Sequence, residues 1–376
     1  MGVEIDPFHA IGISRLAHEL KAQGRSIIHM EFGQPSTGAP GRAIEVAKAV
    51  LDEDSLGYWE SAPLKARLCQ HYDETYSVRL TPDQITLTAG ASAALVSVLA
   101  SALSPGDVIA MAKPGYVAYR NTVKALGMCP LELVCGPDTR FSLTPERIEQ
   151  LEPAPKALIL ASPANPTGTI MSGEELAAIA AVCAERGIAI ISDEIYHGLS
   201  YTRPTRSILE FAPDAFVINS FSKYFSMAGW RLGWLVAPAA KAMKAADYTG
   251  ILFLTPPSLA QHAALVAMDE TAALNRNLET YRQNRALLLD ALPRLGLTEI
   301  APPDGAFYIY ANIEKFSSDS MELCRQLLQD TGVVLAPGID FDPSDGHRYI
   351  RFSFAVSTAE TQEAIRRLES WFAART

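Results

Sequence analysis

Residues 157–196 read ALILASPANPTGTIMSGEELAAIAAVCAERGIAIISDEIY, and this stretch decides the fold. The apolar run Ala157–Ala161 is followed by a helix-like stretch and then by a second apolar run, Ile188–Ile191. The helix has its own boundary signals, because residues 172–175 form a Ser-x-x-Glu capping box and Gly187 is a typical C-terminal residue. The segment therefore predicts a strand–helix–strand unit, the building block of a parallel sheet.

The same alternation of apolar runs and helical stretches extends from about residue 84 to residue 237. The other runs that we expect to be strands are Ile85–Thr88, Val108–Ala112, Leu131–Val134, Ala215–Asn219 and Leu232–Ala237. This pattern is typical of a mostly parallel sheet with helices on both faces. We therefore predict an α/β fold whose large domain, residues 35–280, contains a seven-stranded sheet.

The chain changes character after about residue 270, where strands and helices no longer alternate regularly. The expected elements are a helix around Asn275–Leu295, strands at Ala306–Ala311, Val333–Ala336 and Tyr349–Ala355, and a closing helix near Thr358–Ala374. An amphipathic helix near Ser14–Gln23 is suited to packing on the same unit. We predict a smaller α+β domain made of residues 1–34 and 281–376.

The composition limits the class of protein. With 376 residues, 48% of them hydrophobic, the chain is long enough for two buried cores. Its net charge of −10 argues against nucleic acid or an anionic membrane as a partner, because both require a basic face. Five scattered cysteines and histidines without ligand spacing predict neither disulfides nor a metal site. The N-terminus lacks a signal-peptide pattern, so we expect a cytoplasmic protein.

One stretch, between Asp83 and Asp107, contains no charged residue and is long enough to cross a bilayer. It is rich in Ala, Ser, Thr and Gly, and Gly90 interrupts it after the strand-like sequence ITLT. We predict a strand and a buried helix here instead of a membrane span.

Candidate functional residues follow the predicted strands, since ligands of open α/β sheets bind outside the carboxyl ends of the strands. The residues at these positions are Gly90, Ala91, Ser92, Tyr116, Asn165, Asp193, Tyr196, Ser220, Ser222, Lys223 and Arg231. A lysine amine forms a Schiff base with a carbonyl, and an arginine is a natural clamp for a phosphate. Together these side chains suit a phosphorylated, aromatic, nitrogen-containing aldehyde.

The segment from Ser220 to Trp234 has the pattern S-x-S-K-x-x-x-x-x-G-x-R-x-G-W, which resembles the lysine motif of the class I/II aminotransferases. The sequences NPTG at 165–168, DEIY at 193–196 and YIRFSFA at 349–355 match further family blocks in the same order. The resemblance implies the aspartate-aminotransferase-like fold (fold type I) and pyridoxal 5′-phosphate as cofactor. It also implies amino-group transfer between an L-amino acid and a 2-oxo acid by a ping-pong mechanism.

The resemblance assigns catalytic roles to three residues. Lys223 would form the Schiff base and then act as general acid and base. Asp193 would keep the cofactor's pyridine nitrogen protonated, and Tyr196, with Asn165, would donate hydrogen bonds to its phenolic oxygen.

The resemblance likewise implies contacts to the rest of the cofactor and to the substrate. Tyr116 would stack on the ring. The phosphate would be bound by Gly90, Ala91, Ser92, Ser220, Ser222 and Arg231. Gly33, Asn165 and Arg351 would bind the substrate's α-carboxylate. Tyr58 resembles a tyrosine that reaches the neighbouring subunit's phosphate, although Pro63 stands where the family often has glycine. A homodimer with shared active sites would follow.

The substrate side chain is less clear from the sequence. Ser92 stands where some relatives have a lysine that holds a distal carboxylate, which weakens an aspartate-like reading. The stretch Phe8–Ile13 and the aromatic residues Tyr58 and Trp59 favour hydrophobic or aromatic substrates. Two alternatives stay open: a carbon–sulfur β-lyase that uses the same cofactor, and a non-catalytic regulatory protein with an aminotransferase-like domain.

Overall fold

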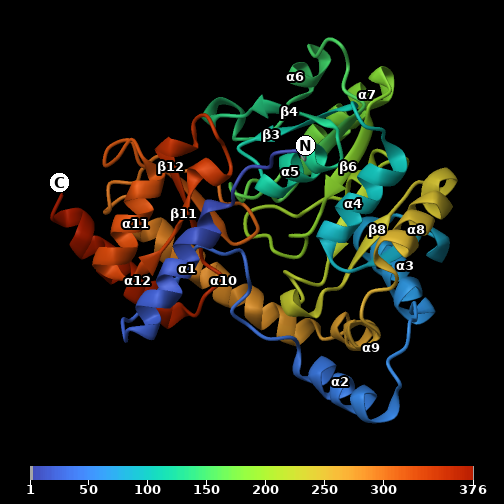
Figure 1. The fold of residues 1–376 in the computed structure, drawn as a ribbon, viewed down its shortest axis with the longest axis horizontal. Helices are drawn as coiled ribbons and strands as arrows, with labels where there is room; N and C mark the ends of the chain where they lie inside the picture. The colour runs from blue at the N-terminus through green and yellow to red at the C-terminus, as the bar shows by residue number, and fades with distance from the viewer. Residues whose placement is uncertain (1–2, 376) are drawn as a thin grey trace.

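A seven-stranded sheet lies at the centre of the computed structural model, which describes residues 3–375 (Figure 1). Its strands, in spatial order, are β2 (Ile85–Thr88), β8 (Gly233–Val236), β7 (Phe216–Ser220), β6 (Ala189–Asp193), β5 (Ala157–Ala161), β3 (Val108–Lys113) and β4 (Cys129–Val134). The strands from β7 to β4 run parallel, and β8 is antiparallel to both of its neighbours. Each predicted apolar run contributes one strand, so the predicted α/β fold with a mostly parallel sheet is confirmed.

Helices cover both faces of this sheet. One face packs against α4 (Ala91–Ala102), α5 (Val117–Ala125) and α8 (Ala239–Phe253). The other packs against α2 (Gly41–Glu53), α3 (Ala62–Tyr76), α6 (Pro145–Glu149), α7 (Gly173–Arg186) and α9 (Ser258–Ala267). The uncharged stretch before Asp107 forms β2 and α4, as expected. Within residues 3–375, no helix is long and apolar enough to cross a membrane.

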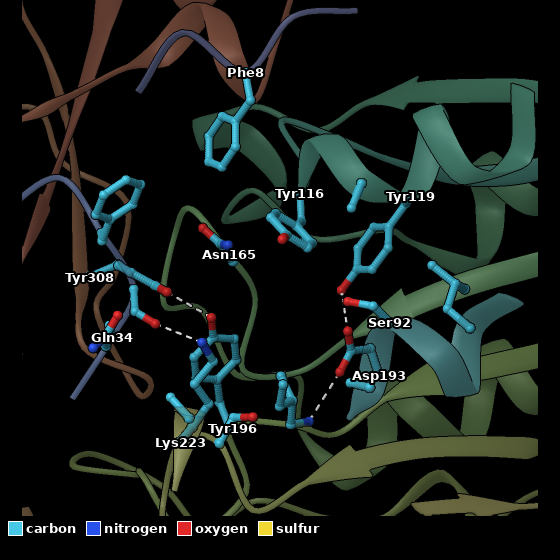
Figure 2. Close-up of a pocket in the computed structure, with 18 of the residues that line it drawn as sticks. Phe8, Gln34, Ser92, Tyr116, Tyr119, Asn165, Asp193, Tyr196, Lys223 and Tyr308 are labelled. Carbon is cyan, nitrogen blue, oxygen red and sulfur yellow. Dashed lines mark hydrogen bonds between the residues drawn. The ribbon is translucent and has the colours of Figure 1, made fainter. Parts of the chain in front are cut away.

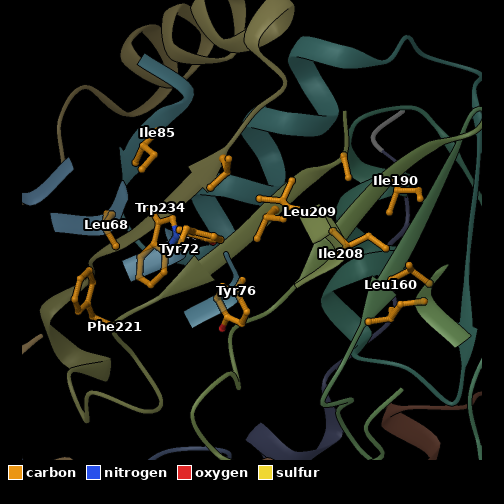
Figure 3. Close-up of a cluster of buried hydrophobic side chains, with 14 of the residues drawn as sticks. Leu68, Tyr72, Tyr76, Ile85, Leu160, Ile190, Ile208, Leu209, Phe221 and Trp234 are labelled. Atoms are coloured by element: carbon orange, nitrogen blue, oxygen red, sulfur yellow. Dashed lines mark hydrogen bonds between the residues drawn. The ribbon is translucent and has the colours of Figure 1, made fainter. Parts of the chain in front are cut away.

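The core on the α3 side of the sheet is closely packed around aromatic residues (Figure 3). Trp234 of β8 is 1% exposed, and its indole N–H donates to the hydroxyl of Tyr72 at 3.1 Å. Phe221, which directly follows β7, packs edge-on against Trp234. These contacts fix the turn that carries Lys223 to the sheet, so the position of the lysine is set by a rigid element.

The smaller unit combines both ends of the chain. Its antiparallel sheet has the order β11 (Ala336–Pro337), β12 (Tyr349–Ser353), β9 (Tyr308–Asn312), and its helices are α1 (His9–Ala22), α11 (Ser320–Thr331) and α12 (Thr358–Ala373). The N-terminal chain joins this unit because β1 (Ile28–His29) pairs in parallel with β10 (Val333–Val334). A separate apolar core holds these elements together. Residues 1, 2 and 376 of the predicted small domain lie outside the described residues.

One long helix, α10 (Thr271–Ala291), connects the two units. Leu274 packs in the core beside the large sheet, and Tyr281 packs in the core of the smaller unit. The domain boundary predicted at residue 280 therefore falls inside a continuous helix, where periodicity gives no sign of a change of partner.

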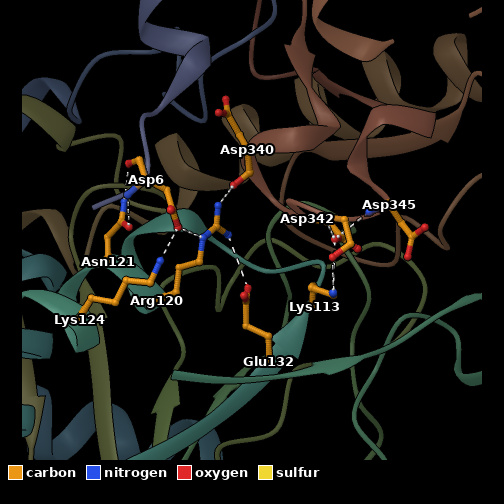
Figure 4. Close-up of polar contacts among 10 residues, drawn as sticks. Asp6, Lys113, Arg120, Asn121, Lys124, Glu132, Asp340, Asp342 and Asp345 are labelled. Atoms are coloured by element: carbon orange, nitrogen blue, oxygen red, sulfur yellow. Dashed lines mark hydrogen bonds and ion pairs between the residues drawn. The ribbon is translucent and has the colours of Figure 1, made fainter. Parts of the chain in front are cut away.

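A network of charges also joins the units, through the N-terminal segment (Figure 4). The Asp6 carboxylate lies 2.8 Å from Nε of Arg120 and 2.9 Å from Nζ of Lys124, both on α5. Asp340 of the smaller unit accepts hydrogen bonds from the backbone N–H groups of His9 and Ala10, at 2.7 and 2.8 Å. Helix α1 consequently begins at His9 and not near residue 14, because a distant carboxylate caps it.

Candidate active site

A cavity of about 480 Å³ lies at the carboxyl ends of the large sheet's strands, beside residues of the smaller unit (Figure 2). This is the position that the topology of an open α/β sheet predicts for a ligand. The predicted site residues that line it are Gly33, Ala91, Ser92, Tyr116, Asn165, Asp193, Tyr196, Ser222, Lys223, Arg231 and Arg351. These residues come from seven separate segments of chain, which the fold brings together in one cavity.

Lys223 follows β7 in the cavity wall, and its Nζ donates to the carbonyl oxygen of Gly33 at 2.6 Å. Burial lowers the pKa of this amine to about 8, and the positive charges of Arg351 and Arg231 act in the same direction. Asp193 opposes that shift with its negative charge. Roughly a tenth of the amine is thus unprotonated at pH 7, far more than for an ordinary lysine, and the unprotonated amine is the nucleophile.

Asp193 ends β6 and is 8% exposed. One of its carboxylate oxygens accepts a hydrogen bond from the Tyr119 hydroxyl, with the two oxygens 2.6 Å apart. The other accepts a hydrogen bond from the backbone N–H of Ile195 at 3.1 Å. Burial raises the pKa of this carboxyl, while both hydrogen bonds and the charge of Lys223 lower it. A buried carboxylate held by two donors at a cavity wall is arranged to pair with a cationic ligand group.

Another part of the cavity wall is suited to an anion. Helix α4 begins there, so its first amides, those of Ala91 and Ser92, point into the cavity with the helix dipole. The Arg231 guanidinium is exposed and donates to the carbonyl oxygens of Ala228 and Ala89, at 3.0 and 3.1 Å. These bonds fix the guanidinium and leave further N–H groups for a ligand.

Gly90 and Ser220 do not line the cavity themselves. The Gly90 N–H is already donated to the Thr88 carbonyl at 2.7 Å, but a Cβ at Gly90 would lie 2.4 Å from Nη2 of Arg231. The absence of a side chain therefore leaves room for the guanidinium. The Ser220 hydroxyl lies 2.8 Å from that of Ser222 and supports it from behind.

Arg351 is a buried cation at the third corner of the cavity, 2% exposed. It donates to the side-chain oxygen of Asn165 at 2.7 Å and to the carbonyl oxygen of Glu31. No carboxylate pairs with it among residues 3–375, and its Nε is buried without a hydrogen-bond partner there. Because an uncompensated buried charge is costly, this guanidinium is prepared for an anionic ligand.

Two tyrosines in the wall were not identified from the sequence. Tyr119 lies one helical turn beyond Tyr116, a spacing that could have suggested a shared site. Tyr308 lies 2.7 Å from the Tyr196 hydroxyl, and no local pattern connects those two residues. Phe8, which belongs to the stretch interpreted as favouring hydrophobic or aromatic substrates, lines the upper end of the cavity (Figure 2).

Tyr58 lies apart from this cavity. Its side chain is 82% exposed in the single chain, and it does not line the site among the described residues. A role for Tyr58 would therefore require a second subunit.

The donor set fits pyridoxal 5′-phosphate. The amides at the start of α4, with Arg231 and Ser222, match a phosphate, and the Cβ-free position at Gly90 keeps that cradle open. Asp193 matches a pyridinium nitrogen, and Lys223 matches an aldehyde carbon. The residues that would hold the cofactor thus form one continuous wall.

The fold and this site define an α/β enzyme that depends on pyridoxal phosphate. The family model described as aminotransferase class I and II matches residues 26–368. The chain belongs to this family and is a pyridoxal-phosphate-dependent aminotransferase that acts on amino acids and 2-oxo acids. The family resemblance, the cofactor and the enzyme class predicted from the sequence are confirmed.

Known relatives agree over almost the whole chain. A valine–pyruvate aminotransferase from Mycobacterium tuberculosis (strain ATCC 25618 / H37Rv) is 41% identical, covering 98% of this chain and 96% of that protein. An aspartate aminotransferase from Geobacillus stearothermophilus is 30% identical, covering 99% and 98%. The crystal structure of an aminotransferase from Mycobacterium tuberculosis superposes with a TM-score of 0.96 at 40% identity, covering 98% and 97%.

Proposed function

We propose that this aminotransferase uses Lys223 as its catalytic base and prefers donors with an apolar side chain. The observation that supports the assignment is the shared cavity, in which a partly buried lysine of lowered pKa, a buried carboxylate and a buried arginine converge; no carboxylate among the described residues pairs with that arginine. When bound, pyridoxal phosphate supplies a carbonyl and an electron-withdrawing ring that stabilises negative charge at the substrate α-carbon.

Different residues of the cavity bind the substrate, transfer the proton and hold the charge. Arg351, with Asn165 beside it, grips the α-carboxylate and orients the α-carbon. Lys223 holds and returns the proton at that carbon. Asp193, fixed by Tyr119, maintains a negative charge opposite Lys223.

The wall beyond these groups favours an apolar substrate side chain. Apart from Lys223, Asp193, Arg231 and Arg351, the lining contains no charged residue among those described. The remaining wall includes Phe8, Phe32, Leu95, Ala118 and Thr122. A distal carboxylate would find no cation there within this chain, and the relative named valine–pyruvate aminotransferase agrees with an apolar donor.

We also propose that the enzyme is a cytoplasmic homodimer. Its five cysteines are all free thiols, as is usual in a reducing compartment. Most of the exposed large apolar side chains of the described residues lie in α2, in the loop that contains Tyr58, and in α8 with the residues after it. Such apolar surface is typical of a subunit interface, which would bring Tyr58 to the site of a partner.

A half-reaction tests the chemistry and ranks the substrates. The purified protein is loaded with pyridoxal phosphate, and single amino acids are added without a 2-oxo acid. We expect one equivalent of the matching 2-oxo acid per site, formed fastest from valine, leucine or alanine and more slowly from aspartate. Continuous release of pyruvate and ammonia from cysteine would instead indicate a lyase.

A further inference from the structure

Tyr308 begins β9 and lies between two residues of the active site, Tyr196 and Arg351. It is 1% exposed, and β9 pairs with β12, the strand that carries Arg351. The phenol contacts Tyr196, Arg351 and the backbone at Gly33. None of these contacts belongs to the roles assigned above.

The hydroxyl of Tyr308 can orient the hydroxyl of Tyr196. The two oxygens are 2.7 Å apart, and a Cβ at Gly33 would lie 1.6 Å from the Tyr308 oxygen. The bare Gly33 backbone therefore leaves only enough room for this phenol. A hydroxyl has one proton, so when Tyr308 donates to Tyr196, the Tyr196 proton is free to point into the cavity. Accepting that bond also makes Tyr196 a stronger donor, because hydrogen bonds in a chain polarise one another.

The ring of Tyr308 supports the arginine. The guanidinium carbon of Arg351 lies 4.3 Å from the centroid of the Tyr308 ring and 4.6 Å from that of Phe341. Contacts with both rings restrict the guanidinium plane, while Nε remains without a partner in the described chain. The orientation of the guanidinium plane determines whether a carboxylate can bind Arg351 through two parallel hydrogen bonds.

We propose that Tyr308 is a positioning residue with two separable functions. Its hydroxyl directs the Tyr196 proton toward the cofactor, and its ring holds Arg351 in the orientation that receives the substrate carboxylate. The inference rests on the proposed function, in which Arg351 binds the substrate carboxylate, and on the role that the family resemblance implies for Tyr196; it adds a residue that contacts both.

Two substitutions separate the functions. Tyr308→Phe removes only the hydroxyl, and Tyr308→Leu also removes the aromatic face. Tyr310→Phe is the matched control, since Tyr310 is also on β9 and 1% exposed, and its hydroxyl has no hydrogen-bond partner in the described chain. Each loaded protein is titrated with alkali while the visible absorbance of the lysine–cofactor linkage is recorded. Binding of isovalerate, a carboxylate without an amino group, is measured from the same absorbance.

In Tyr308→Phe, the midpoint of the absorbance titration should move to higher pH, because a weaker Tyr196 donor stabilises the unprotonated linkage less. Isovalerate affinity should stay within about twofold in this variant and fall about tenfold in Tyr308→Leu, the range expected for losing a desolvated cation–π contact. Tyr310→Phe should match the wild type in both measurements.

A Tyr308→Phe protein that titrates like the wild type would overturn the function of the hydroxyl, whether or not Tyr308→Leu folds. A Tyr308→Leu protein that binds isovalerate as tightly as the wild type would overturn the function of the ring. A wild-type protein that never acquires the cofactor absorbance would instead contradict the function proposed above, so the two failures are distinguishable.

Discussion

Lys223 owes its reactivity to its surroundings, and this dependence can be measured. Only the unprotonated amine attacks a carbonyl, so covalent attachment of pyridoxal phosphate to the apoenzyme should accelerate up to about pH 8, the lowered pKa, and then level off. An ordinary lysine, with a pKa of 10.5, would keep accelerating well beyond that pH. Stopped-flow absorbance gives the rates, and Lys223→Ala should attach nothing and turn over no substrate.

The charge of Arg351 allows a second test of the lowered pKa of Lys223. Because that positive charge lowers the pKa of Lys223, Arg351→Met should move the midpoint of attachment to higher pH. A wild-type midpoint near pH 10, or one that Arg351→Met leaves unchanged, would show that the amine is not perturbed in this way.

Arg351 should matter equally to every substrate, because all amino acids share the α-carboxylate. Charged hydrogen bonds are worth about 1.5–3 kcal/mol, so Arg351→Ala should raise KM roughly 10- to 150-fold for valine, alanine and aspartate alike. Arg348→Ala is the control, since Arg348 pairs with Glu314 near the surface, outside the cavity lining. Steady-state kinetics decide the matter, and a loss confined to one substrate would mean that Arg351 recognises the side chain instead.

At the scale of elements, the sequence predicted best those helix boundaries that are set by residues of the helix itself. Helix α7 runs Gly173–Arg186, as its capping box and Gly187 indicate, because those signals lie within the helix itself. Helix α1 starts earlier than its periodicity suggests, because Asp340, 331 residues from His9, caps it. The Tyr308–Tyr196 pair was equally hidden, since 112 residues separate its members. Predictions failed where a partner comes from another part of the fold.

The N-terminal segment yields a prediction of its own. Asp6 is bound to α5 and His9 to Asp340, so Phe8 is held over the cavity between two anchors (Figures 2 and 4). Releasing one anchor in Asp6→Ala should raise KM for valine and leucine several-fold while changing kcat little, because the apolar wall loosens and the catalytic groups do not move. Phe8→Ala should reproduce this effect.

The control for the N-terminal segment is Asp138→Ala, which removes the surface ion pair with Arg147. Kinetics with valine and leucine should then equal those of the wild type. Equal KM values for Asp6→Ala and the wild type would show that anchoring of the N-terminal segment does not shape the site.

For the whole molecule, the proposed dimer explains two otherwise unconnected features. Tyr58 is strongly exposed although it resembles a family tyrosine that reaches the neighbouring subunit's phosphate, and α8 presents Met243 and Ile251 at 80% and 84% exposure. Side chains of this size are rarely so exposed in clusters unless a partner covers them. If a second copy covers this surface, Tyr58 becomes part of a neighbouring site, and cofactor affinity then depends on association.

Introducing charge at this surface should therefore separate the subunits and, at the same time, weaken cofactor binding. Met243→Asp with Ile251→Asp should shift the mass in sedimentation equilibrium from two chains toward one, because charges would be buried without partners. Pyridoxal phosphate should then dissociate more readily, and Tyr58→Phe should weaken cofactor binding without changing the mass. Val134→Asp, on the edge strand β4 and 50% exposed, is the control and should change neither quantity. A wild-type protein that sediments as one chain with full activity would exclude the shared site, since Tyr58 would then lie beyond the reach of any cofactor.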